Sequence, residues 1–301
     1  MKKVLLTGAT GFIGRAAIPL LLSKGFEVHA VARTIPESNE LAGLHWHSGD
    51  LLDHNTTEKL VAKIKPKYIL HFAWYSVPKK YGTSAENIRW VQASLALLQA
   101  FVQHGGKRIV MAGTCAEYDW NYGYCSEKVT PCVPDTLYGI CKLSLQNMLT
   151  SFAMQSGISA AWGRIFFLYG PHEEQSRLVS SVITSLLKKE TANCSEGSQL
   201  RDFMHVEDVV SAFIALLETN VEGVVNICSG KPYSIKDVAT KIARQLKSEE
   251  LLQFATTLQS NEPSILVGDN RRLKNEVNWV PLFDLDNGIA QTIEWWKTQT
   301  L

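Results

Sequence analysis

VLLTGATGFIG, at residues 4–14, lies between a short apolar run and a segment with the apolar spacing of a helix. The pattern predicts a strand, a glycine-rich turn and a helix. In such a unit, glycines let the backbone turn tightly and approach a pyrophosphate, whose charge sits at the helix N-terminus. We therefore predict a dinucleotide-binding turn here. The expected cofactor contacts in it are Gly8, Gly11, Phe12, Ile13 and Gly14.

The first half of the chain alternates short β-rich apolar runs with helical patterns. Predicted strands are Lys3–Thr7, Glu27–Ala32, Leu44–His47, Tyr68–Ala73, Arg108–Gly113 and Ile158–Phe167. Predicted helices are Ile13–Ser23, Thr57–Ile64, Ala85–His104 and Leu137–Ser156. Most of the strands are apolar on both faces, as strands of a covered parallel sheet are. The order predicts an α/β fold with a Rossmann-type, doubly wound parallel sheet.

The regular alternation stops after Gly170. The later predictions are helices at Leu178–Lys189, Val206–Glu218, Ile235–Leu246 and Leu285–Lys297, a strand at Gly223–Cys228 and a polar loop at Ser195–Gln199. We expect residues 1–170 to form the NAD(P)-binding domain, with some later segments returning to it. Residues 171–301 should then form mainly a smaller mixed α/β lobe that binds the substrate.

Composition excludes several classes of protein. The 301 residues carry a net charge of +1, which gives no electrostatic footprint for nucleic acid or an anionic membrane. The six cysteines form no C-x-x-C pair and no zinc-ligand spacing, so we expect reduced thiols and no metal. The start MKKVLL imitates a secretion signal, but Thr7, Gly8 and Gly11 interrupt it. We expect a cytoplasmic protein.

The end of the second predicted strand bears on the choice of dinucleotide. An acidic residue there would bind the ribose 2′-hydroxyl, whereas an arginine accommodates a 2′-phosphate. The chain reads VHAVARTIP, with Arg33 and no carboxylate before Glu37. This favours NADP, with NAD as the alternative. After the third strand, Asp50 and Leu51 are the expected adenine contacts, although Asp50 could instead cap the next helix.

TLYGICKLS places Tyr138 and Lys142 four residues apart, on one face of a predicted helix. A free tyrosine is a poor acid–base catalyst at neutral pH because its pKa is about 10. A neighbouring ammonium would lower that pKa by stabilising the phenolate. The pair follows the fifth strand and the segment AGTCAEYDW, in which Thr114 supplies a hydroxyl. We therefore expect acid–base chemistry at this place.

The motifs TGATGFIG, GDLLD, HFAW, YGICK, GRIFFLYGP and LRDFMHVEDV occur in this order along the chain. In order and spacing the sequence resembles the extended short-chain dehydrogenases/reductases that act on nucleotide sugars, nearly from end to end. The resemblance implies that Tyr138 is the general acid or base and that Thr114 hydrogen-bonds to the reacting oxygen. Lys142 would bind the nicotinamide ribose and lower the pKa of Tyr138. His71 is expected to be structural.

The resemblance also implies further contacts. Cofactor contacts after the fourth strand would be Phe72, Ala73 and Trp74, together with Tyr138 and Lys142. Substrate contacts would be Tyr75, Thr114, Tyr138, Phe167, Arg201 and Arg272, with Arg271 as an alternative to Arg272. The two arginine positions would hold the substrate diphosphate, whose geometry suits a guanidinium. Trp90 and Phe167 replace asparagines that the family often has. A sugar pocket more apolar than usual, as for a deoxysugar, is therefore one of the open alternatives.

Four reactions in this family share the tyrosine and the lysine. A dehydratase resembling the family needs Asp-Glu directly after the threonine, where this chain has Cys115 and Ala116. Combined epimerase/reductases place a cysteine where Ala116 stands. A 4-epimerase and a 4-ketoreductase remain, and Arg33 favours the reductase because a reductase draws on NADPH at every turnover.

We therefore expect NADPH-dependent reduction of a nucleotide-linked 4-keto-6-deoxyhexose to the 4-hydroxy sugar. Hydride would reach C4 while Tyr138 protonates the emerging alkoxide. A nucleotide-sugar 4-epimerase is the alternative, and a cofactor-sensing regulatory protein is a third hypothesis. The resemblance further implies a homodimer formed through the helices at Ala85–His104 and Leu137–Ser156.

Overall fold

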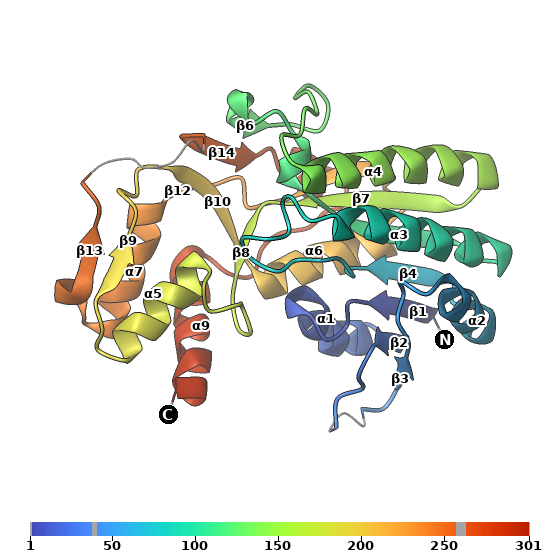
Figure 1. Ribbon diagram of the computed structural model, residues 1–301, viewed down its shortest axis with the longest axis horizontal. Helices are drawn as coiled ribbons and strands as arrows, with labels where there is room; N and C mark the ends of the chain where they lie inside the picture. The colour runs from blue at the N-terminus through green and yellow to red at the C-terminus, as the bar shows by residue number, and fades with distance from the viewer. Residues whose placement is uncertain (1, 38–40, 257–262, 301) are drawn as a thin grey trace.

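The computed structural model describes residues 2–37, 41–256 and 263–300 (Figure 1). Its main sheet has seven parallel strands in the order β11-β7-β5-β4-β1-β2-β3. They are β1 (Lys2–Thr7), β2 (Phe26–Ala32), β3 (Leu44–Ser48), β4 (Tyr68–His71), β5 (Arg108–Thr114), β7 (Ser159–Ile165) and β11 (Gly223–Ile227). The strand order reverses between β1 and β4. The predicted Rossmann-type sheet is therefore confirmed, and ligands of such sheets bind at the carboxyl ends next to the reversal.

Helices cover both faces of this sheet (Figure 1). One face packs on α1 (Phe12–Ser23) and α6 (Val206–Glu218) in a core that includes Leu6, Leu21 and Phe213. The other face packs on α2 (His54–Ile64), α3 (Glu86–Gln103) and α4 (Leu137–Ser156) in a second core. Burial on both faces explains the continuous apolar character of the strands.

The chain crosses between the two parts of the molecule more than once. Although α6 and β11 follow residue 170, α6 packs against α1, and β11 pairs with β7 at the edge of the main sheet. The short helix α8 (Arg271–Asn275) lies beside β11 and adds Leu273 to the same core.

The smaller C-terminal lobe lies at the other end of the molecule (Figure 1). Its core joins α5 (Leu178–Leu187), α7 (Ile235–Leu246) and α9 (Leu285–Thr300). Its strands are β8 (Phe167–Tyr169), β9 (Ala192–Cys194), β10 (Leu200–His205), β12 (Pro232–Ser234), β13 (Leu252–Phe254) and β14 (Ile265–Gly268), with β6 (Tyr124–Cys125) pairing on β14. This mixed arrangement confirms the predicted second lobe.

The prediction of one strand over Ile158–Phe167 is wrong at its end. Strand β7 stops at Ile165, and β8 leaves the main sheet to pair with β10. The ring of Phe166 is buried in a small separate cluster with Tyr118 and Leu266. Burial of that ring draws the chain out of the main sheet, and this redirection places Phe167 on the C-terminal lobe.

A polar contact joins the glycine-rich turn to the C-terminal lobe. Arg15, in the first turns of α1, donates to Nδ1 of His172 at 2.9 Å and to the Thr10 carbonyl at 3.0 Å. The His172 ring packs on Trp295 of α9, with ring centroids 4.4 Å apart. His172 thus links the two lobes.

Candidate functional site

The turn between β1 and α1 requires its glycines. Gly8 has φ +68°, and a Cβ there would lie 2.8 Å from the Ala73 nitrogen. A Cβ on Gly14 would lie 2.0 Å from the Gly8 carbonyl oxygen. Gly11 is the N-cap of α1 and makes no side-chain cap hydrogen bond. The first amide groups of the helix are therefore not bonded to a capping side chain. A bare backbone cradle at a helix N-terminus fits a pyrophosphate.

His71 fixes the segment that follows β4. Its Nδ1 lies 2.7 Å from Thr7 Oγ1, and its Nε2 lies 2.9 Å from Ser94 Oγ. The same Thr7 oxygen accepts from the Ala73 amide at 3.3 Å. Burial lowers the pKa of His71 to about 3, so the ring is neutral. These contacts hold Phe72, which is half-buried, beside the glycine-rich turn, and they give His71 a structural role.

The two predicted contacts at the ends of β2 and β3 lie on the surface. Arg33 follows the last residue of β2 and is exposed, and its carbonyl accepts from Ser48 Oγ. Asp50 is exposed and accepts from the Leu52 amide at 3.0 Å, while Leu51 beside it is buried. The helix α2 is capped by Asp53 instead, so the alternative that Asp50 caps this helix is wrong.

Tyr138 and Thr114 meet at the carboxyl end of β5. The Thr114 hydroxyl lies close enough to the Tyr138 phenol to oppose the rise in its pKa, and the Thr114 oxygen accepts from the Ala116 amide at 3.2 Å. A Cβ on Gly139 would lie 2.4 Å from the Ala116 carbonyl oxygen, so only glycine lets α4 come this close. The close approach brings the phenol onto the hydroxyl.

Lys142 lies one turn further along α4 and is buried. Its Nζ donates to the Ala112 carbonyl at 2.9 Å and stands 3.7 Å from the centre of the Trp74 ring. Burial lowers the pKa of Lys142 to about 7, against the opposing charge of Glu117. The ammonium is thus held between a strand end and an indole face.

In this arrangement Lys142 is not among the groups that act most on the pKa of Tyr138. Burial raises the pKa of Tyr138 above its usual value, and the group that opposes this rise most is Thr114. The reason is geometric, because the ammonium is directed to Ala112 and Trp74. At neutral pH the phenol therefore keeps its proton and can donate it.

The remaining polar groups of AGTCAEYDW serve the scaffold. Glu117 is fully buried and accepts from the Thr114 amide at 2.9 Å, from Trp162 Nε1 at 2.9 Å and from Arg164 Nε at 2.6 Å. Burial raises the pKa of the Cys115 thiol, which keeps it protonated. Neither side chain is placed to exchange a proton with a sugar.

Two predicted substrate residues come together at the start of the C-terminal lobe. The Arg201 guanidinium lies 5.5 Å from the centre of the Phe167 ring, on paired strands β10 and β8. Arg201 is buried and donates to the carbonyls of Leu200 and Pro263. Tyr75, in the loop after β4, is half-buried.

Arg272 is held by contacts of the scaffold, and its expected contact to the substrate stays a prediction. Its guanidinium donates to the carbonyls of Val224 and Glu222 along the outer edge of β11, and it pairs with Glu276. An edge strand leaves carbonyls without a strand partner, and Arg272 satisfies two of them. The alternative, Arg271, pairs with Asp269. Both arginines are thus held by contacts within the scaffold.

Sequence reasoning missed Tyr81 and Arg177. The Tyr81 ring meets Tyr138 edge to face, with centroids 4.9 Å apart. The Arg177 guanidinium, at the start of α5, lies 5.6 Å from the Tyr81 ring centre. Tyr81 lies in an irregular loop whose pattern carries no period, so only the proximity of a second aromatic residue to Tyr138 could have marked it.

Two kinds of feature are absent from the part of the chain that the structure describes. No helix there has the length and apolar character to cross a membrane. Nor do its histidine, cysteine and acidic side chains form a group of three suited to a metal ion.

Comparisons with known proteins place the chain in a family. The model of the NAD dependent epimerase/dehydratase family matches residues 4–228. UDP-glucose 4-epimerase of Corynebacterium glutamicum is 27% identical over 304 residues, which cover 93% of this chain and 91% of that protein. The dTDP-6-deoxy-L-talose 4-dehydrogenase (NAD(+)) of Aggregatibacter actinomycetemcomitans is 28% identical over 240 residues, which cover 77% and 86%.

Solved structures agree. MoeE5 in complex with UDP-glucose and NAD superposes with a TM-score of 0.85 at 27% identity, covering 99% of this chain and 100% of that one. The family model spans well over half of the chain, and it includes the glycine-rich turn, Thr114, Tyr138 and Lys142. The chain therefore belongs to the NAD-dependent epimerase/dehydratase family, and it is an enzyme of the extended short-chain dehydrogenase/reductase type.

Proposed function

We propose that this enzyme reduces a nucleotide-linked 4-keto-6-deoxyhexose to the 4-hydroxy sugar with NADPH. The observation that carries the proposal is the end of β2, where exposed Arg33 follows Ala32 and no carboxylate lies between Ala32 and Glu37. A guanidinium there suits a ribose 2′-phosphate. A reductase consumes its reduced cofactor at each turnover, which favours NADPH, whereas an epimerase regenerates its cofactor.

Bound NADPH would supply a hydride to C4 of the sugar. Tyr138 would give its phenolic proton to the oxygen at C4, and Thr114 would hydrogen-bond to the same oxygen as negative charge develops there. Burial holds the pKa of Tyr138 above its usual value, so the proton is present at neutral pH. Lys142 would bind a hydroxyl of the nicotinamide ribose.

The side chains expected around the substrate are consistent with this assignment. Arg201 would meet the diphosphate, and Phe167 beside it would present an apolar surface to the sugar. One relative of this chain is named for dehydrogenation at position 4 of a dTDP-linked 6-deoxy sugar. That relative is named with NAD(+), so the proposed preference for NADPH rests on Arg33.

A nucleotide-sugar 4-epimerase is the second candidate, favoured by the likeness to UDP-glucose 4-epimerase along nearly the whole chain. It would use the same three side chains and would differ in retaining its cofactor through oxidation and reduction.

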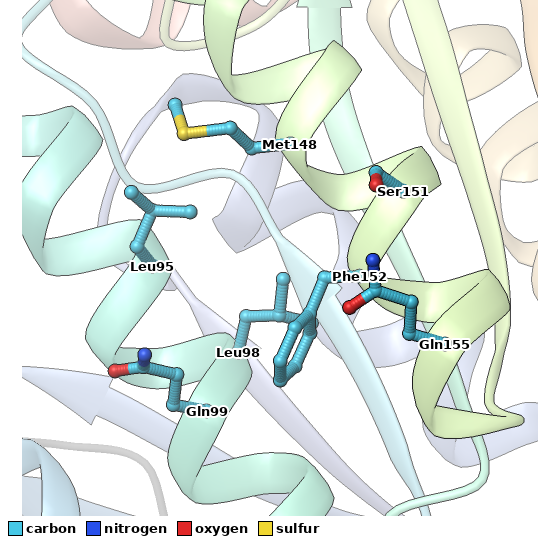
Figure 2. A pocket seen from close by; sticks show the side chains of 7 residues that line it. All are labelled: Leu95, Leu98, Gln99, Met148, Ser151, Phe152 and Gln155. Atoms are coloured by element: carbon cyan, nitrogen blue, oxygen red, sulfur yellow. The ribbon is translucent and has the colours of Figure 1, made fainter.

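We also propose that the enzyme is a homodimer. Helices α3 and α4 lie side by side and carry exposed Ile88, Ile140, Met148 and Met154. Figure 2 shows a hollow between the two helices, lined by Leu95, Leu98, Gln99, Met148, Ser151, Phe152 and Gln155. The same two helices of a second copy would cover this largely apolar surface and form a four-helix interface.

The reduction can be tested by mixing the enzyme with NADPH and dTDP-, GDP- or CDP-linked 4-keto-6-deoxy sugars. We expect loss of NADPH absorbance with one of them. Tyr138→Phe should lower kcat by about 10²- to 10⁴-fold, because it removes the proton donor, and should change cofactor affinity far less than kcat. Interconversion of UDP-hexoses with bound NAD, and no oxidation of NADPH, would establish the epimerase instead.

Arg33→Asp should raise the KM for NADPH by at least about tenfold, because it replaces a charge-assisted contact with a like-charge one. The KM for NADH should change little. Arg244→Asp, an exposed change on α7, serves as the control. Equal effects of Arg33→Asp on the two cofactors would show that Arg33 does not read the 2′-phosphate.

The buried ammonium should make the stability of the protein depend on pH. The pKa of Lys142 is about 7 in the folded chain and about 10.4 in an unfolded one. Between these values the unfolded state binds the extra proton, so this group's contribution to stability rises with pH. Below about pH 7 both states are protonated and the folded one carries the cost of burial.

Lys142→Met should therefore raise Tm at about pH 6, and the gain should shrink toward about pH 10. Calorimetry of the cofactor-free protein measures this difference, with exposed Lys274→Met as the control. A difference in Tm that stays constant with pH would contradict the lowered pKa.

Charge placed on the α3–α4 surface should separate the proposed dimer. Met148→Glu should shift the solution mass from dimer to monomer, because an unpaired carboxylate is costly in an apolar interface. Sedimentation measures the mass, and Val280→Glu, on another exposed site, should leave it unchanged. A monomeric parent protein would refute the dimer.

A further inference from the structure

The indole of Trp74 packs against the buried Lys142 ammonium, closer than the second indole nearby, that of Trp162, whose ring centre lies 5.8 Å from Nζ. Trp74 follows β4, and the Lys142 ammonium stands 3.7 Å from the centre of its ring. An ammonium has three donors. The Ala112 carbonyl takes one at 2.9 Å, and the electron-rich indole face stabilises the cation from another side.

A buried amide fixes the indole in place. Trp74 Nε1 donates to Asn87 Oδ1 at 2.8 Å. Asn87 Nδ2 donates in turn to the carbonyls of Tyr81 at 2.6 Å and Ser84 at 2.8 Å. Asn87 is fully buried in the first turn of α3. Within the described residues, its side chain bonds to the Trp74 indole and to these two carbonyls. The indole is therefore attached to both the loop after β4 and α3.

The same loop contacts the other member of the catalytic pair. The Tyr81 ring packs edge to face on Tyr138 at 4.9 Å between centroids, and the Trp74 ring does so at 6.4 Å. The Gly82 carbonyl accepts from the Tyr138 amide at 3.0 Å. One set of contacts centred on Trp74 and Asn87 thus bears on both Lys142 and Tyr138.

We propose that Trp74 is a positioning residue for the catalytic pair. Its indole face holds the Lys142 ammonium at the end of β5, and its bond to Asn87 keeps the indole there. With one donor on Ala112 and the ring on another side, Lys142 keeps a donor for a hydroxyl of the bound cofactor. The catalytic part of this inference rests on the proposed function, whereas the contact between the indole and the ammonium does not.

Two substitutions at Trp74 separate the effect of the aromatic ring face from the effect of side-chain volume. Trp74→Phe keeps an aromatic face, whereas Trp74→Leu fills part of the space without one. We expect Trp74→Leu to lower kcat by about tenfold, as loss of a desolvated cation–π contact implies, with the KM for the sugar nearly unchanged. Trp74→Phe should recover most of kcat. Trp46→Leu, a half-buried tryptophan on β3, is the matched control and should retain activity.

A spectroscopic measurement tests the contact without turnover. In protein labelled with ¹³C at lysine Cε and kept at about pH 5, where Lys142 is protonated, the Lys142 signal should lie upfield of the other lysine signals because its Nζ stands over an indole ring, and Lys142→Met identifies it. Trp74→Leu should move the signal downfield, Trp74→Phe should move it less, and Trp46→Leu should leave it in place. Each variant must show the thermal transition of a folded protein.

The outcomes are distinguishable. An upfield Lys142 signal that Trp74→Leu does not move overturns the inference. So does a Trp74→Phe variant as inactive as Trp74→Leu with the same sugar. If the parent enzyme reduces no 4-keto sugar, the proposed reduction fails, and the position of the Lys142 signal still decides the inference.

Discussion

The arrangement of the sheet beside Thr114 and Tyr138 depends on the buried carboxylate of Glu117. A carboxylate removed from water is costly unless it is paired and hydrogen-bonded. Here the Arg164 guanidinium, the Trp162 indole and the Thr114 amide all donate to it. Since Arg164 and Trp162 belong to β7 and Thr114 ends β5, one side chain holds two strand ends together. The bond to the Thr114 amide is one half of a capping box, and in the other half the Thr114 oxygen accepts from the Ala116 amide, so Glu117 helps to fix the turn that carries the Thr114 hydroxyl.

Ala116 acts in this arrangement in two ways. It offers no group that could transfer a proton, which sets the chain apart from the dehydratase pattern. Its carbonyl also lies where a side chain on Gly139 would collide with it, so the close approach of α4 depends on this pair. The contact that brings the phenol to the threonine and the lack of a second acid thus occur at the same short turn.

Local patterns were enough to predict the β1–α1 turn, the parallel sheet and the face shared by Tyr138 and Lys142. These features depend on residues close together in the chain, where spacing carries the information. The sequence did not predict that Trp74 and Asn87 hold Lys142, since those contacts join three separate segments. The contacts of Arg272 with the carbonyls of Val224 and Glu222 were not predicted, because nothing local marks β11 as an edge strand. The split between β7 and β8 depends on where the Phe166 ring is buried, which periodicity does not report.

The return of α6 and β11 to the main sheet has a consequence for how the molecule can be divided. A fragment ending near residue 170 would keep β7 as a bare sheet edge and would leave the apolar face of α1 without α6. The complementary fragment would carry a strand with no sheet to join. The chain passes back and forth between the two lobes, so neither lobe corresponds to one continuous segment that could be transferred to another protein as an independent domain.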